Sequence, residues 1–225
     1  MTAVLAPAER AARDLADLDD LALGVRLLAG VPTNEGRDPE LLRQWVGAAA
    51  AFGASLDLAP CTARVVESGG GMAAGLLARY TSRPPAVELY TDAIAAAEDL
   101  VDRLGWRHWY PPGSVRAAAL AHEAVHEQLH HGRARSALRR STGLVVLRLG
   151  EHRVYGHVAG ADEIAAHAYA RESCGLGRSP LLLTAALAAA TGPRDGSPPP
   201  QDSPPRRSAR SARSARETLR RGREK

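Results

Sequence analysis

The sequence lacks any apolar run of about 18 residues or more, the length that a membrane-spanning helix requires. Its first residues, up to Asp20, turn acidic and have neither the basic start nor the apolar stretch of a signal peptide. It has only two cysteines, Cys61 and Cys174, and they do not have the spacing of a metal site. Two well-separated thiols without an export signal predict a cytoplasmic protein in a reducing environment.

Positive charge is also scarce outside the C-terminal segment. The chain carries a net charge of +4, but residues 193–225 hold ten basic and four acidic side chains, which leaves the preceding residues at −2. The body of the chain, residues 1–192, therefore has no excess of basic residues of the kind that is typical of nucleic-acid-binding proteins. The Pro- and Arg-rich residues 192–225 are predicted to be a disordered tail. The alternative is a weak contact of this tail with nucleic acid or acidic surfaces.

Hydrophobic residues make up 45% of the chain, enough for a globular body. We expect an α+β fold, with a small antiparallel or mixed three-stranded sheet packed on helices. The predicted domains are an N-terminal helical segment at 1–55, a second domain at 56–191, and the tail. The second helix of the first segment should begin with Asp38 as its cap and Pro39 in its first turn.

Glycines at 69–71 and prolines at 84–85 interrupt residues 60–91, and the segments between them predict three short strands, TARVVES, MAAGLLARYTS and AVELY. The Ala-rich part MAAGLLARY also fits a helix. The stretch 144–149 fits either a strand or a buried helix. Helices are predicted at 92–105, 114–132, 161–174 and 179–191, with Ser114 as the cap of the second.

Within the helix predicted at 114–132, the pattern HExxH occurs twice in overlapping registers, at 122–126 and 126–130. Two histidines one turn apart share a helix face and can bind one Zn²⁺, and the glutamate after the first can act as general base. A small, apolar turn precedes His122, whereas the second register lies at the polar end of the helix. We therefore predict His122 and His126 as ligands and Glu123 as the base, with His130 turned away from the metal.

A third ligand is expected from the segment GADEIAAHAYARE, where Glu163 lies 37 residues after His126. A carboxylate there would complete a His₂Glu set with an open position for water. The alternatives are that Glu163 is an ordinary acid of the first helical turn, or that His167 is the ligand in its place. His167, Tyr155 and His157 are also candidates for supporting a ligand or for stabilising an oxyanion.

The motif AxLAHExxH followed by ExxAHAYARE resembles the ImmA/IrrE-like zinc metallopeptidases, over roughly residues 40–185. The second signature of that family maps onto Glu163, Ala166, Tyr169 and Ala170. The resemblance implies a zincin-like fold in which residues 56–191 form the metallopeptidase domain. It also implies a gluzincin with one Zn²⁺ per chain, the ligands and base named above, and a protein or peptide substrate. The alternative function is a non-catalytic metal-binding module with a regulatory or partner-binding role. A nucleic-acid-associated protein acting through the tail is a third hypothesis.

Deleting residues 193–225 is expected to leave the melting temperature and the zinc content nearly unchanged, because the tail lacks residues that could form a core. Calorimetry and metal analysis of the full and shortened chains measure both quantities. A melting temperature lower by many degrees in the shortened chain would contradict the prediction.

Overall fold

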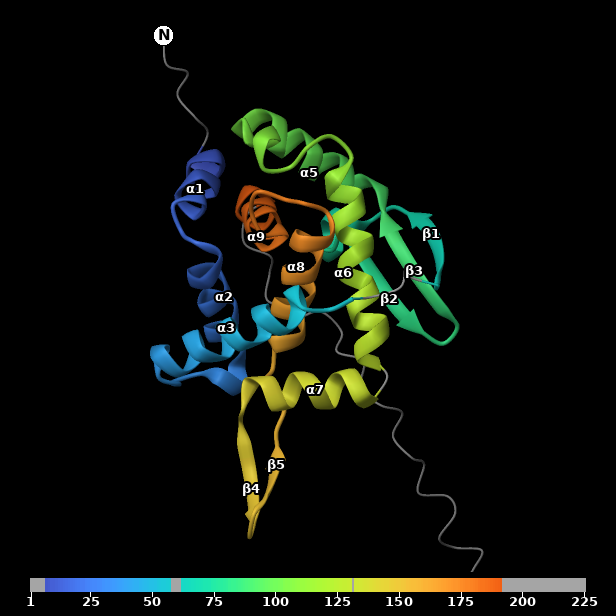
Figure 1. The fold of residues 1–225 in the computed structure, drawn as a ribbon. Helices are drawn as coiled ribbons and strands as arrows, with labels where there is room; N and C mark the ends of the chain where they lie inside the picture. Colours follow the sequence, from blue (N-terminus) through green and yellow to red (C-terminus); the bar gives the residue numbers. More distant parts are fainter. Residues whose placement is uncertain (1–6, 58–61, 131, 192–225) are drawn as a thin grey trace, which may run out of the picture. The chain divides into compact units, whose positions relative to one another are not determined.

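Helices dominate the fold, and two small sheets are added to them, which makes it a mixed α+β structure (Figure 1). The computed structural model describes residues 7–57, 62–130 and 132–191, and these belong to one compact unit, Met1–Pro193. The predicted tail at 192–225 lies outside the described residues. No helix in the described part of the chain is long and apolar enough to cross a membrane.

The N-terminal residues form helices, as predicted. They are α1 (Pro7–Ala16), α2 (Asp20–Ala29), the short 3-10 helix η1 (Pro32–Asn34) and α3 (Pro39–Ala54). Asp38 caps α3 as expected, since its carboxylate accepts a hydrogen bond of 2.9 Å from the backbone N–H of Glu40. The sequence therefore locates the start of α3 correctly.

The three-stranded sheet is mixed. It consists of β1 (Arg64–Ser68), β2 (Ala78–Ser82) and β3 (Pro85–Tyr90) in the order β1-β3-β2. The central strand β3 runs parallel to β1 and antiparallel to β2. The predictions of strands in TARVVES and AVELY are confirmed, and β2 is an edge strand that faces the helices.

The prediction of one strand over MAAGLLARYTS is wrong in its first half, where Gly71–Ala74 form the single helical turn α4. The cause is a tertiary contact. The carboxylate of Asp92 accepts hydrogen bonds of 3.0–3.2 Å from the N–H groups of Gly70, Gly71 and Met72, which fixes the start of the turn. A Cβ on Gly71 would lie 2.2 Å from that of Tyr90, so only glycine fits there.

The remaining predicted helices are confirmed as α5 (Thr91–Leu104), α6 (Ser114–His130), α8 (Ala161–Ser173) and α9 (Pro180–Thr191). Ser114 is not the cap of α6. Gly113, at φ 80°, accepts the first helical hydrogen bond from Ala117, and the Ser114 hydroxyl is buried without a partner among the described residues. A positive φ favours glycine, and the cap of the helix therefore lies one residue before the predicted Ser114, while the helix itself begins at 114 as predicted.

The chain between α6 and α8 contains elements that the sequence did not predict. Helix α7 (Gly132–Thr142) follows α6, and the ambiguous stretch at 144–149 is the strand β4 (Val145–Leu149), paired with β5 (His152–Tyr155) in an antiparallel hairpin. The hairpin projects from the body beyond α7 (Figure 1). Helices α6 and α8 are thus joined by a structured segment.

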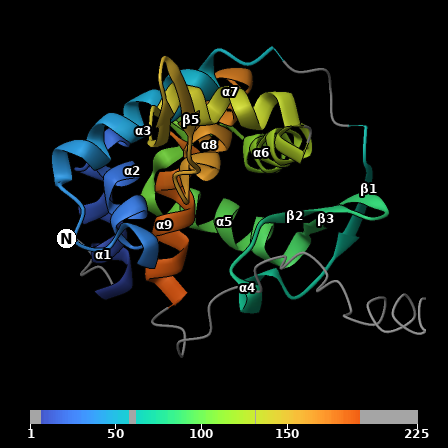
Figure 2. The same ribbon diagram turned by 90° about the horizontal axis from the view of Figure 1, so that it is seen from below.

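Helix α8 lies in the middle of the helical body, packed against α3 on one side and α6 on the other (Figures 1 and 2). Gly53 permits the close approach of α3, because a Cβ there would lie 2.1 Å from the carbonyl oxygen of Ala165. The buried side chains around α8 include Trp45, Val46, Val125, Ile164 and Leu182, all exposed by 4% or less.

Polar contacts attach the N-terminal helices to the C-terminal ones. The Asp20 carboxylate accepts hydrogen bonds of 3.1 Å from the side chains of Arg171 and Arg178 and from the backbone N–H of Ser179. The carbonyl of Ser179 accepts a bond of 2.8 Å from the hydroxyl of Tyr110, which is 1% exposed. Helices α1, α2 and α3 therefore share a core with α8 and α9, and the proposed boundary at residue 55 stays a prediction.

Substituting Gly53→Ala is expected to destabilise the fold by about 1–3 kcal/mol, because the new methyl group overlaps the α8 backbone. Gly47→Ala in the same helix is the matched control. A Cβ there has nothing within 4 Å, so the change should stabilise the helix by about 0.5–1 kcal/mol. Urea unfolding of both variants measures the difference. Equal stabilities would show that α3 and α8 do not approach as closely as described.

Candidate metal centre

Helix α6 presents His122 and His126 one turn apart, as predicted. Their Nε2 atoms lie 3.0 Å from each other, and their side chains are 13% and 22% exposed. The ring centroids are 4.8 Å apart. Both rings therefore direct the same nitrogen to one point beside the helix.

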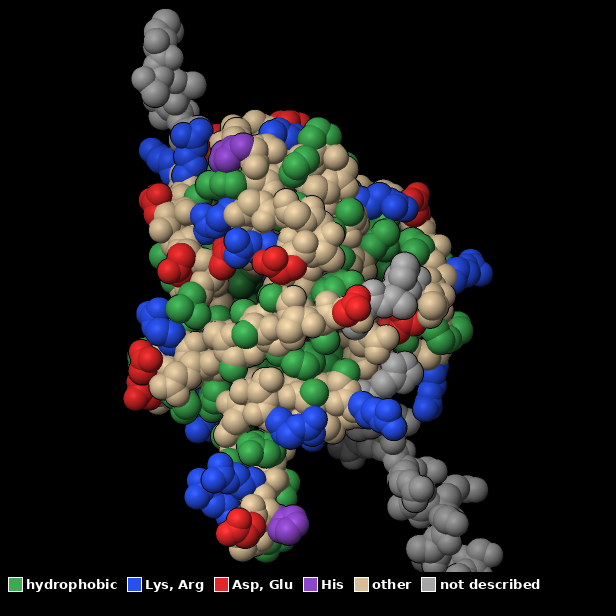
Figure 3. Space-filling view, viewed as in Figure 1, with side chains coloured by type: hydrophobic (Ala, Val, Ile, Leu, Met, Phe, Trp, Pro, Cys, Tyr) green, Lys and Arg blue, Asp and Glu red, His purple; other side chains and the backbone are tan. Residues whose placement is uncertain are grey.

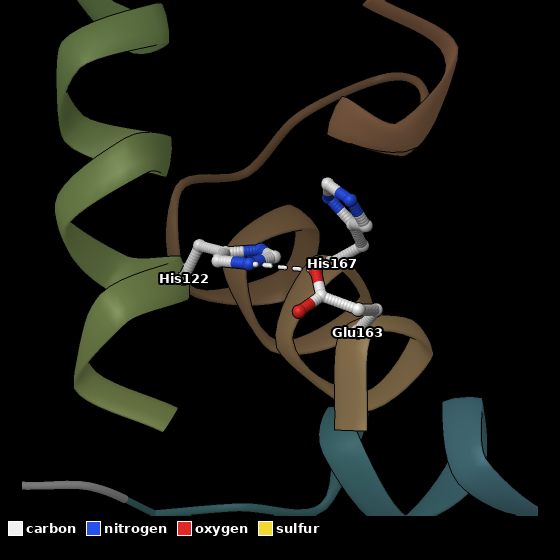
Figure 4. Close-up of side chains that lie close together, drawn as sticks. All are labelled: His122, Glu163 and His167. Carbon is white, nitrogen blue, oxygen red and sulfur yellow. Dashed lines mark ion pairs between the residues drawn. The ribbon is translucent and has the colours of Figure 1, made fainter. Parts of the chain in front are cut away.

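Glu163 reaches that point from the first turn of α8. One carboxylate oxygen lies 3.2 Å from Nε2 of His122, and the other lies 3.3 Å from Nε2 of His126. Figure 4 shows the carboxylate of Glu163 facing the ring of His122 across the gap between the two helices. The Glu163 side chain is 44% exposed, so the cluster can be reached from solvent. The structure thus brings together the three residues that the sequence predicts as ligands, while their binding of a metal stays a prediction.

The spacing of these donor atoms fits one tetrahedral metal ion. Ligands held about 2.0–2.1 Å from a tetrahedral zinc ion lie about 3.3–3.4 Å from one another, close to the 3.0–3.3 Å found here. Two imidazole nitrogens and a carboxylate are also donors that Zn²⁺ accepts. Two triads of donors within 4.8 Å share Glu163, namely His122–Glu163–His167 and His126–Asp162–Glu163. Glu163 is therefore the centre of the donor set.

The charges in the cluster support one another. Removal from water lowers the pKa of His126, but the hydrogen bond and the negative charge of Glu163 outweigh this and raise it to about 9. Removal from water raises the pKa of Glu163, but hydrogen bonds and charges from His122 and His126 hold it well below its usual value. An ionised Glu163 beside a protonated His126 follows at neutral pH, and a cation bound there would displace that proton.

His167 lies against His122 from the next turn of α8, with ring centroids 4.5 Å apart (Figure 4). It is 7% exposed, and burial lowers its pKa to about 3, so the ring is neutral at pH 7. The Nδ1 atoms of His122 and His167 are both buried, and neither has a hydrogen-bond partner among the described residues. His167 is therefore close enough to support His122 or to bind the metal itself.

Glu123, the predicted base, is buried to 7% exposure and touches the edge of the sheet. One of its oxygens accepts a hydrogen bond of 2.7 Å from the backbone N–H of Tyr80 in β2. This bond leaves the second oxygen without a hydrogen bond among the described residues. The negative charge of Glu123 also contributes to the raised pKa of His126, which places the carboxylate near the ligands.

The other candidates lie away from this cluster. Tyr155 ends the strand β5, and His157 follows it on an exposed loop; among the described residues, neither has a ring contact or hydrogen bond with the ligands. His130 is exposed and packs edge-on against the ring of Tyr80, with centroids 6.2 Å apart. The first register of the motif is thus the one that faces α8.

Two residues of the site were not singled out from the sequence. Asp162 belongs to the donor set around His126, and its position next to Glu163 could have drawn attention to it. No sequence pattern indicates that the backbone N–H of Tyr80 would bind Glu123, because the contact depends on how the edge strand β2 packs against α6.

We expect one tightly bound Zn²⁺ per chain, lost in His122→Ala, His126→Ala and Glu163→Ala but kept in His130→Ala. Each of the first three changes removes a donor atom, whereas His130 contributes none. Metal analysis after dialysis measures the zinc content of each variant. Loss of zinc in His130→Ala together with its retention in His122→Ala would show that the second register binds the metal.

Comparison of the chain with protein-family models, with curated proteins and with solved structures found no match. The resemblance to ImmA/IrrE-like metallopeptidases therefore stays a prediction from the two motifs. The convergence of His122, His126 and Glu163 from two separate helices is an independent observation on this chain.

Proposed function

We propose that this chain is a zincin-like, zinc-dependent metallopeptidase that hydrolyses peptide bonds of a protein substrate in the cytoplasm. The observation that carries the proposal is the mutual spacing of 3.0–3.3 Å among two imidazole nitrogens and a carboxylate. That donor set comes from the HExxH helix and from a second helix, which is the arrangement expected of a His₂Glu site.

His122, His126 and Glu163 would hold the ion. A bound zinc ion would lower the pKa of a coordinated water to about 7 and polarise the substrate carbonyl. Glu123 would accept the proton of the attacking water and later transfer it to the leaving amine, as general acid–base catalysis requires. The N–H of Tyr80 restrains one oxygen of Glu123, so its side chain is oriented before substrate binds.

A donor for the developing oxyanion must come from a residue near the ligands. Among the three candidates, His167 alone is in contact with the cluster, through the ring of His122. The neutral ring offers one N–H donor.

His167 also favours a second candidate function, a non-catalytic metal-binding module with a regulatory or partner-binding role. It forms one donor triad with His122 and Glu163. If it bound the ion together with His126, four protein ligands would leave no open position for water, as in structural zinc sites. Glu123 would then have no catalytic role. The absorption spectrum of the Co²⁺-substituted protein distinguishes the two, since His167→Ala changes it only if His167 is a ligand.

Glu123→Gln is expected to keep the fold and the zinc but to lower peptide hydrolysis by about 10²–10⁴-fold. Glutamine has nearly the same shape and can still accept the N–H of Tyr80, but it cannot take up a proton at neutral pH. Digestion of denatured cellular protein by the zinc-loaded chain, followed by mass spectrometry, provides substrates for the rate measurement.

The control is Glu127→Gln on the same helix, whose carboxylate accepts a hydrogen bond from Thr62 at 3.1 Å rather than facing the ligands. This variant should keep full activity. Full activity in Glu123→Gln would contradict the role given to Glu123, and the absence of hydrolysis in the unmodified chain would favour the non-catalytic module.

A further inference from the structure

The hairpin β4–β5 carries four of the five large hydrophobic side chains that are exposed in the described structure. Five large hydrophobic residues are exposed in the described ranges, and four of them lie here: Val146 (59%), Leu147 (49%), Leu149 (61%) and Val154 (45%). The fifth is Val65 on β1, at 41%. Such a concentration on a projecting element marks an interaction site.

The pairing register separates the side chains onto two faces. Leu147 is opposite Val154, and Arg148 is opposite Arg153. Since paired residues share a face and successive residues alternate, Leu147, Leu149 and Val154 form a mainly apolar face, which also carries His152, the partner of Leu149. Arg148 and Arg153 lie on the other face. Like charges placed directly opposite each other destabilise a strand pair, and neither arginine has an ion pair with a described residue.

The hairpin belongs to a strongly basic segment. Residues 132–157 contain six arginines and one acid, Glu151, for a net charge of +5. Because residues 1–192 together carry −2, the remainder of that body carries −7. Figure 3 shows basic side chains along α7 and on the hairpin at the lower end of the molecule. An anionic partner is therefore attracted to this segment and repelled by the rest of the body.

The outer edges of the hairpin are open. β4 and β5 form a two-stranded sheet, and in the described part of the chain no third strand pairs with either. Unpaired backbone N–H and C=O groups on an edge can accept another strand. An isolated two-stranded hairpin is also only marginally stable in water, so an added strand would stabilise it.

We propose that the hairpin β4–β5 binds an extended protein segment in which apolar and acidic side chains alternate, added as a third strand. Such a strand places its apolar residues beside those of the edge that it joins, Leu147 and Leu149 on β4 or Val154 on β5. Its carboxylates then lie beside the arginine of that edge. It thereby extends the apolar face and compensates the charge of one of the two opposed arginines. This binding is independent of any hydrolysis at the metal centre.

Two other anionic partners fit the hairpin less well. A phosphate backbone offers nothing to cover three aliphatic side chains. On a membrane, the apolar face would point into the lipid, while Arg148 and Arg153 would point away from the anionic headgroups. Glu151 lies in the turn of the hairpin, where it would meet the negative surface in either case.

The test uses the full chain and three fluorescent peptides of equal length: one alternates Val and Glu, one alternates Val and Lys, and one contains Val and Glu in two separate blocks. Fluorescence anisotropy at low and moderate salt measures binding. The alternating Val–Glu peptide should bind tightest, and its affinity should fall as salt is added. Equal binding of all three peptides, or no binding of the first, would overturn the proposal.

Variants then locate the site. Arg148→Glu with Arg153→Glu should weaken the Val–Glu peptide by about tenfold or more and improve the Val–Lys peptide. Leu147→Ser with Leu149→Ser should weaken both alternating peptides. The matched controls on β1, Arg64→Glu and Val65→Ser, should change neither, and circular dichroism verifies that all variants are folded. Unchanged peptide affinity in the hairpin variants would refute the site.

Duplex DNA and vesicles of phosphatidylcholine with phosphatidylglycerol are measured alongside the peptides. Binding of either that exceeds binding of the Val–Glu peptide, and that the Arg148→Glu and Arg153→Glu double variant removes, would assign the hairpin to that partner instead. The measurement is made with and without added Zn²⁺. Loss of zinc binding in the metal-centre variants would leave peptide binding unchanged, so the two proposals fail separately.

Discussion

The candidate centre depends on the position of α8, which is fixed by close contact with α3. A Cβ on Gly53 would lie 2.1 Å from the carbonyl oxygen of Ala165. The two backbones are therefore so close at this point that only glycine fits at position 53. On its other side α8 packs against α6. Glu163 and the two histidines converge because these contacts hold α8 between the two helices. Protein interiors are close-packed and deform little. A displacement of α8 caused by a larger side chain at Gly53 would therefore move Glu163 relative to the two histidines.

The part of the site that sequence could predict is the part set by local geometry. His122 and His126 share a face because a helix repeats every 3.6 residues, and the N-terminus of α3 follows from Asp38 and Pro39. Glu163 was identified by its residue type and its position in a second helix. The sequence could not show that Glu163 lies beside the two histidines. In the structure its two carboxylate oxygens lie 3.2 and 3.3 Å from their Nε2 atoms.

The features that sequence missed depend on contacts between distant segments. The N–H of Tyr80 holds Glu123 only because the edge strand β2 lies beside α6. The turn α4 forms where Asp92 accepts three backbone N–H groups, and helix propensity alone would not place it there. Gly113 rather than Ser114 is the residue that precedes α6 as its cap, since the preceding prolines and the positive φ of Gly113 set the direction of entry. Tertiary structure overrides local preference at all three points.

The segment joining α6 and α8 concentrates positive charge, while the rest of the body, which carries the candidate centre, has a net negative charge. In the absence of Arg148, Arg153 and the arginines of α7, the net charge of the body would disfavour the approach of an acidic chain. Charge separation of this kind acts mainly on the rate and orientation of encounter, and the apolar face of Leu147, Leu149 and Val154 would supply affinity after contact. The hairpin leads directly into the loop before α8, and Glu163 lies in the first turn of that helix. A chain bound at the hairpin would therefore lie on the segment that leads into the helix of Glu163.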